Sequence, residues 1–79
     1  MEVTVRLHVS LIKFLPEGAR EKTVSVRLPE GAEVADIADQ LNIPARYVKL
    51  IFVNGGRASK QTRLSDGDRV SLFPPVGGG

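Results

Sequence analysis

Apolar and polar residues alternate along three separate stretches of this 79-residue chain, namely residues 3–10, 23–28 and 69–73. A period of two predicts β-strands that bury one face and expose the other. Residues 49–53 are apolar at almost every position and predict a further strand. Asn54-Gly55 follows directly and favours a hairpin, because both turn positions require a positive φ. The chain is therefore expected to build a sheet, with room for a short strand after the hairpin turn.

One stretch, residues 33–41, has helical periodicity. Its apolar side chains recur at i, i+3, i+4 and i+7, and acidic residues in the first turn suit the positive end of a helix dipole. Asn42 and Pro44 are expected to end this helix. Residues 11–15 are too densely apolar for alternation and predict a short helical turn. This order of elements predicts an α+β roll, in which one main helix crosses a mixed sheet of four to five strands.

The composition narrows the possible functions. The chain has the length of one domain, and without cysteine it offers no disulfide, no thiolate nucleophile and no strong zinc site. A net charge of +2, without a basic stripe lined by aromatic residues, argues against nucleic acid as a partner. No apolar run approaches the length of a membrane span and no signal peptide is recognisable, so we expect a cytoplasmic protein without a membrane partner.

The C-terminal residues combine two prolines with three glycines. Pro74-Pro75 favours an extended backbone that leads away from the folded domain. Gly77, Gly78 and Gly79 lack side chains and would fit a channel too narrow for any other residue. Such a tail is either a frayed terminus or a probe that carries a carboxylate into the active site of a partner.

The whole chain, and residues 64–79 most specifically, resembles the ubiquitin-like sulfur carriers, a family that includes the small subunit of molybdopterin synthase and the thiamine-pathway sulfur carrier. The resemblance rests on Asp66-Gly67-Asp68, Phe73-Pro74-Pro75 and Gly78-Gly79, which occur together at the spacing of that family. It implies a ubiquitin-like β-grasp domain at residues 1–73 and a flexible tail at residues 74–79. It also implies that Gly79 is adenylated and converted to a thiocarboxylate that donates sulfur. Gly77 departs from the molybdopterin branch, which often has alanine, serine or threonine there.

The resemblance also implies partners. An E1-like adenylating enzyme would hold ATP, a sulfurtransferase or another donor would supply sulfur, and an acceptor such as the molybdopterin synthase large subunit would receive it. The chain itself would bind no cofactor or metal, and would be a protein cosubstrate, monomeric when free, rather than an enzyme. The Phe-Pro-Pro-Val sequence and the chain length favour the molybdopterin pathway over the thiamine pathway. A ubiquitin-like modifier joined to lysine side chains and a β-grasp binding module with an inert tail are the alternatives.

Strand parity predicts a partner-binding patch beside the tail. If Val70 and Leu72 face the core, Phe73 faces outward and contributes to partner binding rather than to the fold. In the neighbouring apolar strand, Ile51 and Val53 are then expected inside. The patch on the outer face contains Leu50, Phe52 and Phe73 and continues into Pro74, Pro75 and Val76.

Three arginine residues have the same outward parity, namely Arg6, Arg27 and Arg69. They either rim the patch and meet an acidic partner surface or are merely solvated. A shift of one residue at a strand end would reverse the parity of the whole assignment.

Three other features of the sequence have ordinary structural explanations. His8 has no second histidine or cysteine with which to bind a metal, so a solvated or sheet-face side chain is expected. Asp66 and Asp68 flank Gly67 as in part of a calcium loop, but the other ligands are missing and a turn is expected. Tyr47 is expected to pack near the end of the helix.

Overall fold

The structure, a computed structural model, describes residues 1–75, which form one five-stranded sheet in the order β2-β1-β5-β3-β4. The strands are β1 (Glu2–Leu7), β2 (Thr23–Arg27), β3 (Leu50–Val53), β4 (Gly56–Ala58) and β5 (Arg69–Phe73). The central pair, β1 and β5, is parallel, and the three other pairs are antiparallel. The predicted mixed sheet is therefore confirmed, and the optional short strand after the hairpin turn is β4.

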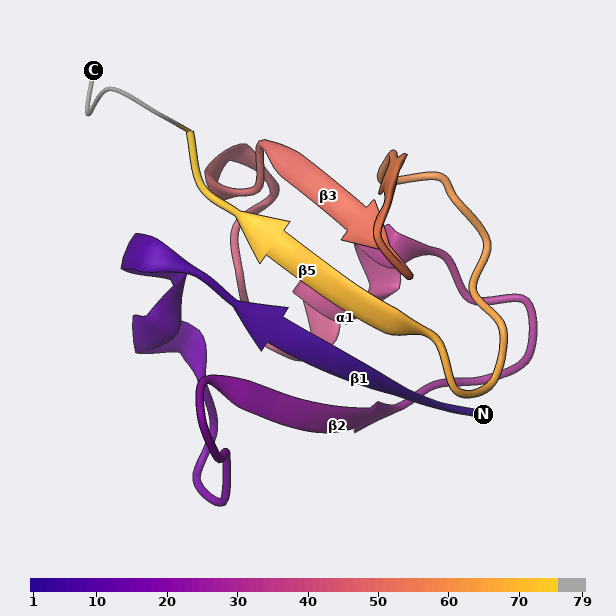
Figure 1. Cartoon of the computed structure of the whole chain (residues 1–79), viewed down its shortest axis with the longest axis horizontal. Coiled ribbons are helices and arrows are strands. Elements are labelled where there is room, and N and C mark those ends of the chain that lie inside the picture. Colours follow the sequence, from indigo (N-terminus) through magenta and orange to yellow (C-terminus); the bar gives the residue numbers. More distant parts are fainter. Residues whose placement is uncertain (76–79) are drawn as a thin grey trace.

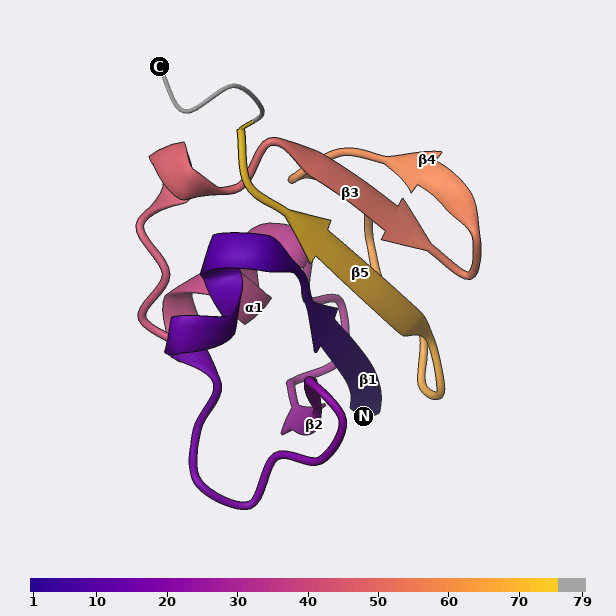
Figure 2. The ribbon, with the colours of Figure 1, turned by 60° about the vertical axis from the view of Figure 1, so that its left-hand side comes forward.

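Among the described residues, one α-helix, α1 (Val34–Gln40), covers one face of this sheet, and residues 1–75 leave the other face open (Figures 1 and 2). The helix connects the edge strand β2 with β3, which lies beyond the central pair, so the chain crosses behind the sheet. Two short 3-10 helices complete the fold, η1 (Val9–Phe14) and η2 (Ala45–Tyr47). The predicted α+β roll is thus confirmed, and the expected helical turn at residues 11–15 is η1, which begins two residues earlier.

Helix α1 is too short to be stable alone, so its ends and its packing must hold it. The Asp36 carboxylate accepts a hydrogen bond from the backbone N–H of Glu33 at 2.8 Å, which closes the first turn. The N–H groups of Val34 and Ala35 donate to backbone carbonyls of the loop that follows β4, at 3.0 and 2.9 Å. Asn42, with φ +62°, ends the helix as predicted. None of the helices within residues 1–75 is long and apolar enough to cross a membrane.

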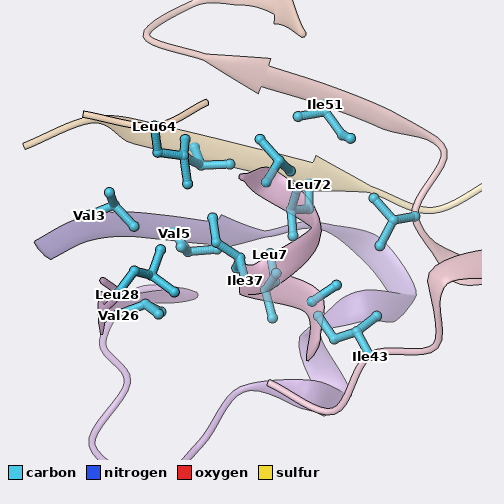
Figure 3. Packing of buried hydrophobic residues seen from close by; sticks show 14 of the residues in the cluster. Val3, Val5, Leu7, Val26, Leu28, Ile37, Ile43, Ile51, Leu64 and Leu72 are labelled. Atoms are coloured by element: carbon cyan, nitrogen blue, oxygen red, sulfur yellow. The ribbon is translucent and has the colours of Figure 1, made fainter. Parts of the chain in front are cut away.

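The core lies between α1 and the covered face of the sheet (Figure 3). The register places Val5 beside Val70 and Leu7 beside Leu72, and these four side chains are at most 2% exposed. Ile37 of α1 packs against them with no exposed surface. Full burial of each such side chain stabilises the fold by about 1.5–3 kcal/mol before entropy is counted. The inward parity predicted for β5 is therefore confirmed.

Polar side chains fix the turns at the end of the sheet where β5 begins. Asn54 and Gly55 have φ values of +51° and +86°, as the hairpin prediction requires. The Asn54 amide donates to Asp68 Oδ1 at 2.9 Å and accepts from the Arg69 N–H at 2.9 Å, which ties the hairpin to β5. Asp66 Oδ1 accepts from the N–H of Glu2 at 2.7 Å, which ties the preceding turn to β1. Asp66 and Asp68 are therefore turn residues, as predicted.

The opposite end of the sheet, where β1 passes into η1, has an unusual geometry. Val9 has φ +55°, a left-handed conformation that is a genuine outlier for a β-branched residue, and its side chain is 70% exposed. The ring of His8 stacks on that of Phe73, with ring centres 3.9 Å apart and planes 10° apart. His8 is thus a sheet-face histidine, one of the two alternatives predicted. Its Nε2 atom is buried, with no hydrogen-bond partner among the described residues.

The surroundings of His8 favour its neutral form. Burial lowers the pKa of His8 below its usual value, and the nearby charges of Arg6 and Lys22 lower it further. Protonation would also place an N–H at Nε2, where the described residues offer no acceptor. In the unfolded chain the side chain titrates normally, so the unfolded state binds more protons between the lowered pKa and about 6.5.

The free energy of unfolding should therefore fall as the pH drops through about 6.5 and level off below the lowered pKa of His8. Thermal denaturation between pH 7.5 and 5.5 measures this, because 1 kcal/mol shifts the melting temperature of such a domain by about 4–8 °C. The His8→Phe variant keeps a ring on Phe73 and should lose most of the dependence. An equally steep dependence in the variant would assign the effect to other groups.

Candidate functional site

The candidate site surrounds the tail root, which we define as Phe73-Pro74-Pro75, at the end of the central strand β5. Pro74 is buried and Pro75 is exposed. The folded domain thus extends at least one residue beyond the boundary predicted at residue 73, because Pro74 continues the inward parity of Val70 and Leu72. Pro74 is accordingly packed against the domain. Val76, Gly77, Gly78 and Gly79 lie outside the described residues.

An apolar patch lies on the open face of the sheet beside the tail root, and it consists of Leu50, Phe52 and Phe73. Leu50 lies directly opposite Phe73 across β3 and β5, so the two side chains share this face. Phe52 and Phe73 meet edge to face, with ring centres 5.8 Å apart and planes 81° apart. Ile51 is buried on the other face, and Val53 is half-buried against the core. The structure therefore places the three residues together as predicted.

Phe73 is more tightly held than an outward-facing residue needs to be. Its ring is covered on one face by His8 and touches the edge of Phe52, so it is only half exposed. The prediction that Phe73 contributes nothing to the fold is therefore too simple. Alternation along β5 gave the direction of the side chain, but the partner His8 comes from the end of a different strand, which local periodicity does not reveal.

A shallow hollow of about 440 Å³ extends from this patch across the open face. Arg6 and Arg69 both line it together with Phe52 and Phe73, so two of the three predicted arginines do reach the patch. Arg27 does not line it. It lies opposite Glu2 at the other end of β1 and is 4.0 Å from that carboxylate, so it is on the predicted face but far from the tail root.

A second hollow, the η1–η2 groove, was not predicted from the sequence. It has a volume of about 310 Å³ and adjoins the other side of the tail root, and it is lined by Ser10, Leu11, Lys13, Phe14, Tyr47, Pro74 and Pro75. Tyr47 packs against the core from η2, which contacts α1, so it is a packing residue as expected. Its ring also lies 6.2 Å from that of Phe14, and the two rings form part of the groove surface. The closely spaced apolar residues of η1 indicated that this segment packs against something. The sequence did not indicate that its neighbour would be η2, which is distant along the chain.

The described residues offer little for catalysis. Within residues 1–75 no three histidine or acidic side chains lie close enough together to hold a metal ion. Asn54 and Gly55 form a hairpin whose polar groups are engaged with β5, not a phosphate-binding loop before a helix. What the site offers is a tail root between two aromatic surfaces that carry cations, which suits docking to another protein.

Solved structures of ubiquitin-like proteins are similar to this chain. SAMP1 from Haloferax volcanii has a TM-score of 0.73. A complex of subunits 1 and 2 of molybdopterin-converting factor from Helicobacter pylori has a TM-score of 0.62, and the thiamine biosynthesis protein ThiS from Geobacter metallireducens one of 0.60. In all three cases the sequence identity is 25%, and the alignment covers 100% of both chains. The comparison with curated proteins gives no match.

The sequence also matches the Mut7-C ubiquitin family over residues 1–77. The five-stranded sheet with one main helix is the β-grasp fold of the three structures just named. Since the family match spans nearly the whole chain, the protein belongs to the Mut7-C ubiquitin family, within the ubiquitin-like sulfur carriers and modifiers.

Proposed function

We propose that this chain is a sulfur carrier, whose Gly79 carboxylate is adenylated by a partner enzyme and then converted to a thiocarboxylate. The observation that carries the proposal is the tail root itself. A buried Pro74 and an exposed Pro75 follow the central strand, and Val76 and the three glycines come next in the sequence. Rigid attachment to the central strand sets the direction of the chain at residue 75, and residues without side chains can enter a narrow channel.

The chemistry demands activation by a partner. An oxygen of the Gly79 carboxylate attacks the α-phosphate of ATP, which releases pyrophosphate and leaves an acyl-adenylate. Hydrosulfide, or the outer sulfur of a persulfide, then displaces AMP to form a carbon–sulfur bond. With a persulfide, a thiol must afterwards cleave the sulfur–sulfur bond to leave the thiocarboxylate. The chain supplies only the carboxylate, so we assign ATP to an adenylating enzyme and the sulfur to a sulfurtransferase.

The patch of Leu50, Phe52 and Phe73 is the proposed docking surface for these partners. A half-buried aromatic pair beside a tail is well placed to be fully buried as the tail enters a partner's active site. Arg6 and Arg69 border the patch, and no carboxylate among residues 1–75 forms an ion pair with either. They are therefore available to acidic groups of the partner, which would favour correct association and orientation.

The acceptor of the sulfur is proposed by similarity. The molybdopterin-converting factor of Helicobacter pylori was solved as a complex of its two subunits, and this chain aligns over its full length with one protein of that complex. We therefore propose a large-subunit partner and a role in molybdopterin synthesis. The thiamine pathway is the second possibility, supported by the similarity to ThiS. Offering the thiocarboxylated chain to each acceptor enzyme and measuring sulfur transfer would separate the two pathways.

The similarity to SAMP1, whose full name is small archaeal modifier protein 1, favours one other function, covalent attachment to proteins. Activation by adenylation serves both functions, and the difference lies in the nucleophile that then attacks. A modifier would accumulate in amide linkage to lysine side chains, whereas a sulfur carrier would accumulate as a thiocarboxylate. Mass spectrometry of the protein from its own cells distinguishes these products.

The first prediction from this proposed function concerns the terminal residue, Gly79. Incubation with its adenylating enzyme, ATP and a sulfur source should raise the intact mass by the difference between one sulfur and one oxygen. Removal of Gly79 should abolish this change and leave the melting temperature within about 1 °C, because the residue follows the packed domain. Acquisition of sulfur by the shortened chain would falsify the proposal.

A second prediction tests the narrow channel. Gly78→Val should fold normally but fail to stimulate the ATP–pyrophosphate exchange of the adenylating enzyme, because a β-branched side chain cannot enter a channel shaped for bare backbone. Gly78→Ala is the milder control and should retain part of the exchange rate. Full activity of both variants would mean that the glycines serve only as a flexible end.

A third prediction separates docking from folding. Phe73→Ala should destabilise the fold by about 1–2 kcal/mol, since it loses the stack on His8, and should weaken partner binding by about 2 kcal/mol or more. Leu72→Ala is the matched control on the next residue, whose side chain is fully buried, and should cost about 2–5 kcal/mol of stability. Denaturation curves and a binding titration measure both quantities. Wild-type affinity in Phe73→Ala would remove the patch from the interface.

A further inference from the structure

The η1–η2 groove brings together side chains from two short helices that are more than thirty residues apart in the sequence. Both helices lie at the end of the sheet from which β5 leads into the tail root, as Figures 1 and 2 show. Leu11 is buried beneath the groove, and the rings of Phe14 and Tyr47 are half exposed. Pro74 and Pro75 line it as well, so the groove and the tail root form one continuous surface.

Two cations are held over the rings of the groove. The Lys13 ammonium lies 5.5 Å from the centre of the Phe14 ring and 5.6 Å from that of Tyr47. The Arg46 guanidinium carbon lies 4.7 Å from the centre of the Tyr47 ring. Cation–π contacts of this kind restrain long side chains that would otherwise move freely, so less entropy is lost when a ligand binds them.

The Tyr47 hydroxyl is a third polar group at the groove, and it too can donate a hydrogen bond. The Arg46 guanidinium donates to the Tyr47 hydroxyl oxygen at 3.4 Å, which leaves the hydroxyl proton free to bond to another acceptor. The Lys13 ammonium, the Arg46 guanidinium and the Tyr47 hydroxyl are therefore all hydrogen-bond donors on or beside the Tyr47 ring. The ion pairs within residues 1–75 join the N-terminus to Glu30 and Arg27 to Glu2, so no described carboxylate neutralises Lys13 or Arg46.

Cations that form no ion pair with a described carboxylate, and that lie over aromatic rings, favour an anionic ligand. A neutral apolar segment would leave both cations without partners, and a basic segment would be repelled. The carboxylates of an acidic segment can accept hydrogen bonds from these donors while their methylene groups rest on the rings. This surface differs from the patch of Leu50, Phe52 and Phe73, which lies on the open sheet face and is lined by other arginines.

We infer that the η1–η2 groove binds an acidic segment, bearing Asp or Glu side chains, of the enzyme that adenylates the tail. This inference rests on the proposed function, because the groove is continuous with the tail root and any enzyme that takes the tail must approach it. The enzyme would then contact this chain on both sides of the tail root, at the patch and at the groove. The patch on the open sheet face contributes apolar contact area. The charges at the groove orient the chain on the enzyme, so that the tail meets the entrance of the channel.

The experiment reverses the charges of the groove in the full chain. The double variant Lys13→Glu/Arg46→Glu reverses the two charges that lie over the Phe14 and Tyr47 rings. It is compared with Arg27→Glu/Arg63→Glu, which makes the same change in net charge with two exposed residues, neither of which stacks on these rings. Binding to the adenylating enzyme is titrated at several salt concentrations. The groove variant should bind at least tenfold more weakly with a shallower salt dependence, while the control should change less than threefold. Equal weakening of both variants, or wild-type affinity of the groove variant, would overturn the inference.

A second measurement does not depend on sulfur chemistry. A hexaglutamate peptide with blocked ends is titrated into the isotopically labelled chain and the NMR signals of the Tyr47 ring and the Lys13 ammonium are followed, with hexaglutamine as the control peptide. Signals that shift with hexaglutamate but not with hexaglutamine, and that do not shift in Lys13→Glu/Arg46→Glu, would support binding of an acidic segment at the groove. This result would hold even if the chain never acquires sulfur. No shift, or shifts caused only by inorganic phosphate or single-stranded DNA, would exclude an acidic protein segment as the occupant.

Discussion

The parallel pairing of β1 with β5 is the contact on which the rest of the structure depends. It joins residues from the two ends of the described chain and buries Val5 and Leu7 beside Val70 and Leu72 at the centre of the sheet. The edge strands and the helix add to this pair on either side. The pairing also fixes where β5 ends, because its register with β1 places Phe73 beside His8. The tail root is thus set by the most buried part of the fold.

Two different surfaces therefore lie beside the tail root. On the open sheet face the rings of Phe52 and Phe73 form an apolar surface, and at the end of the sheet the groove between η1 and η2 offers cations over aromatic rings. The carboxylates of Asp66 and Asp68 lie at the other end of the sheet, where they fix turns. The end of the sheet at the tail root thus carries aromatic rings and cations, whereas the opposite end carries carboxylates that serve the fold.

Local patterns in the sequence predicted the elements well but not their long-range partners. Alternation, the helical period of residues 33–41 and Asn54-Gly55 each report on neighbours in the chain, and each was confirmed. The stack of His8 on Phe73 and the groove between η1 and η2 depend on strand order and on residues far apart, so no local period contains them. The same limit explains Arg27, whose parity was right but whose position along the strand placed it at the wrong end of the sheet.

The central place of β5 also has a consequence for synthesis on the ribosome. A chain that has emerged only as far as β4 has β1 and β2 as a hairpin, but it lacks the strand that joins them to β3. Apolar side chains of β1 and α1 then have no β5 to cover them, and contacts so distant in sequence form slowly. Folding must therefore wait until residues 69–73 have left the exit tunnel. Under the proposed function, an incomplete chain would present no ordered tail root to an activating enzyme.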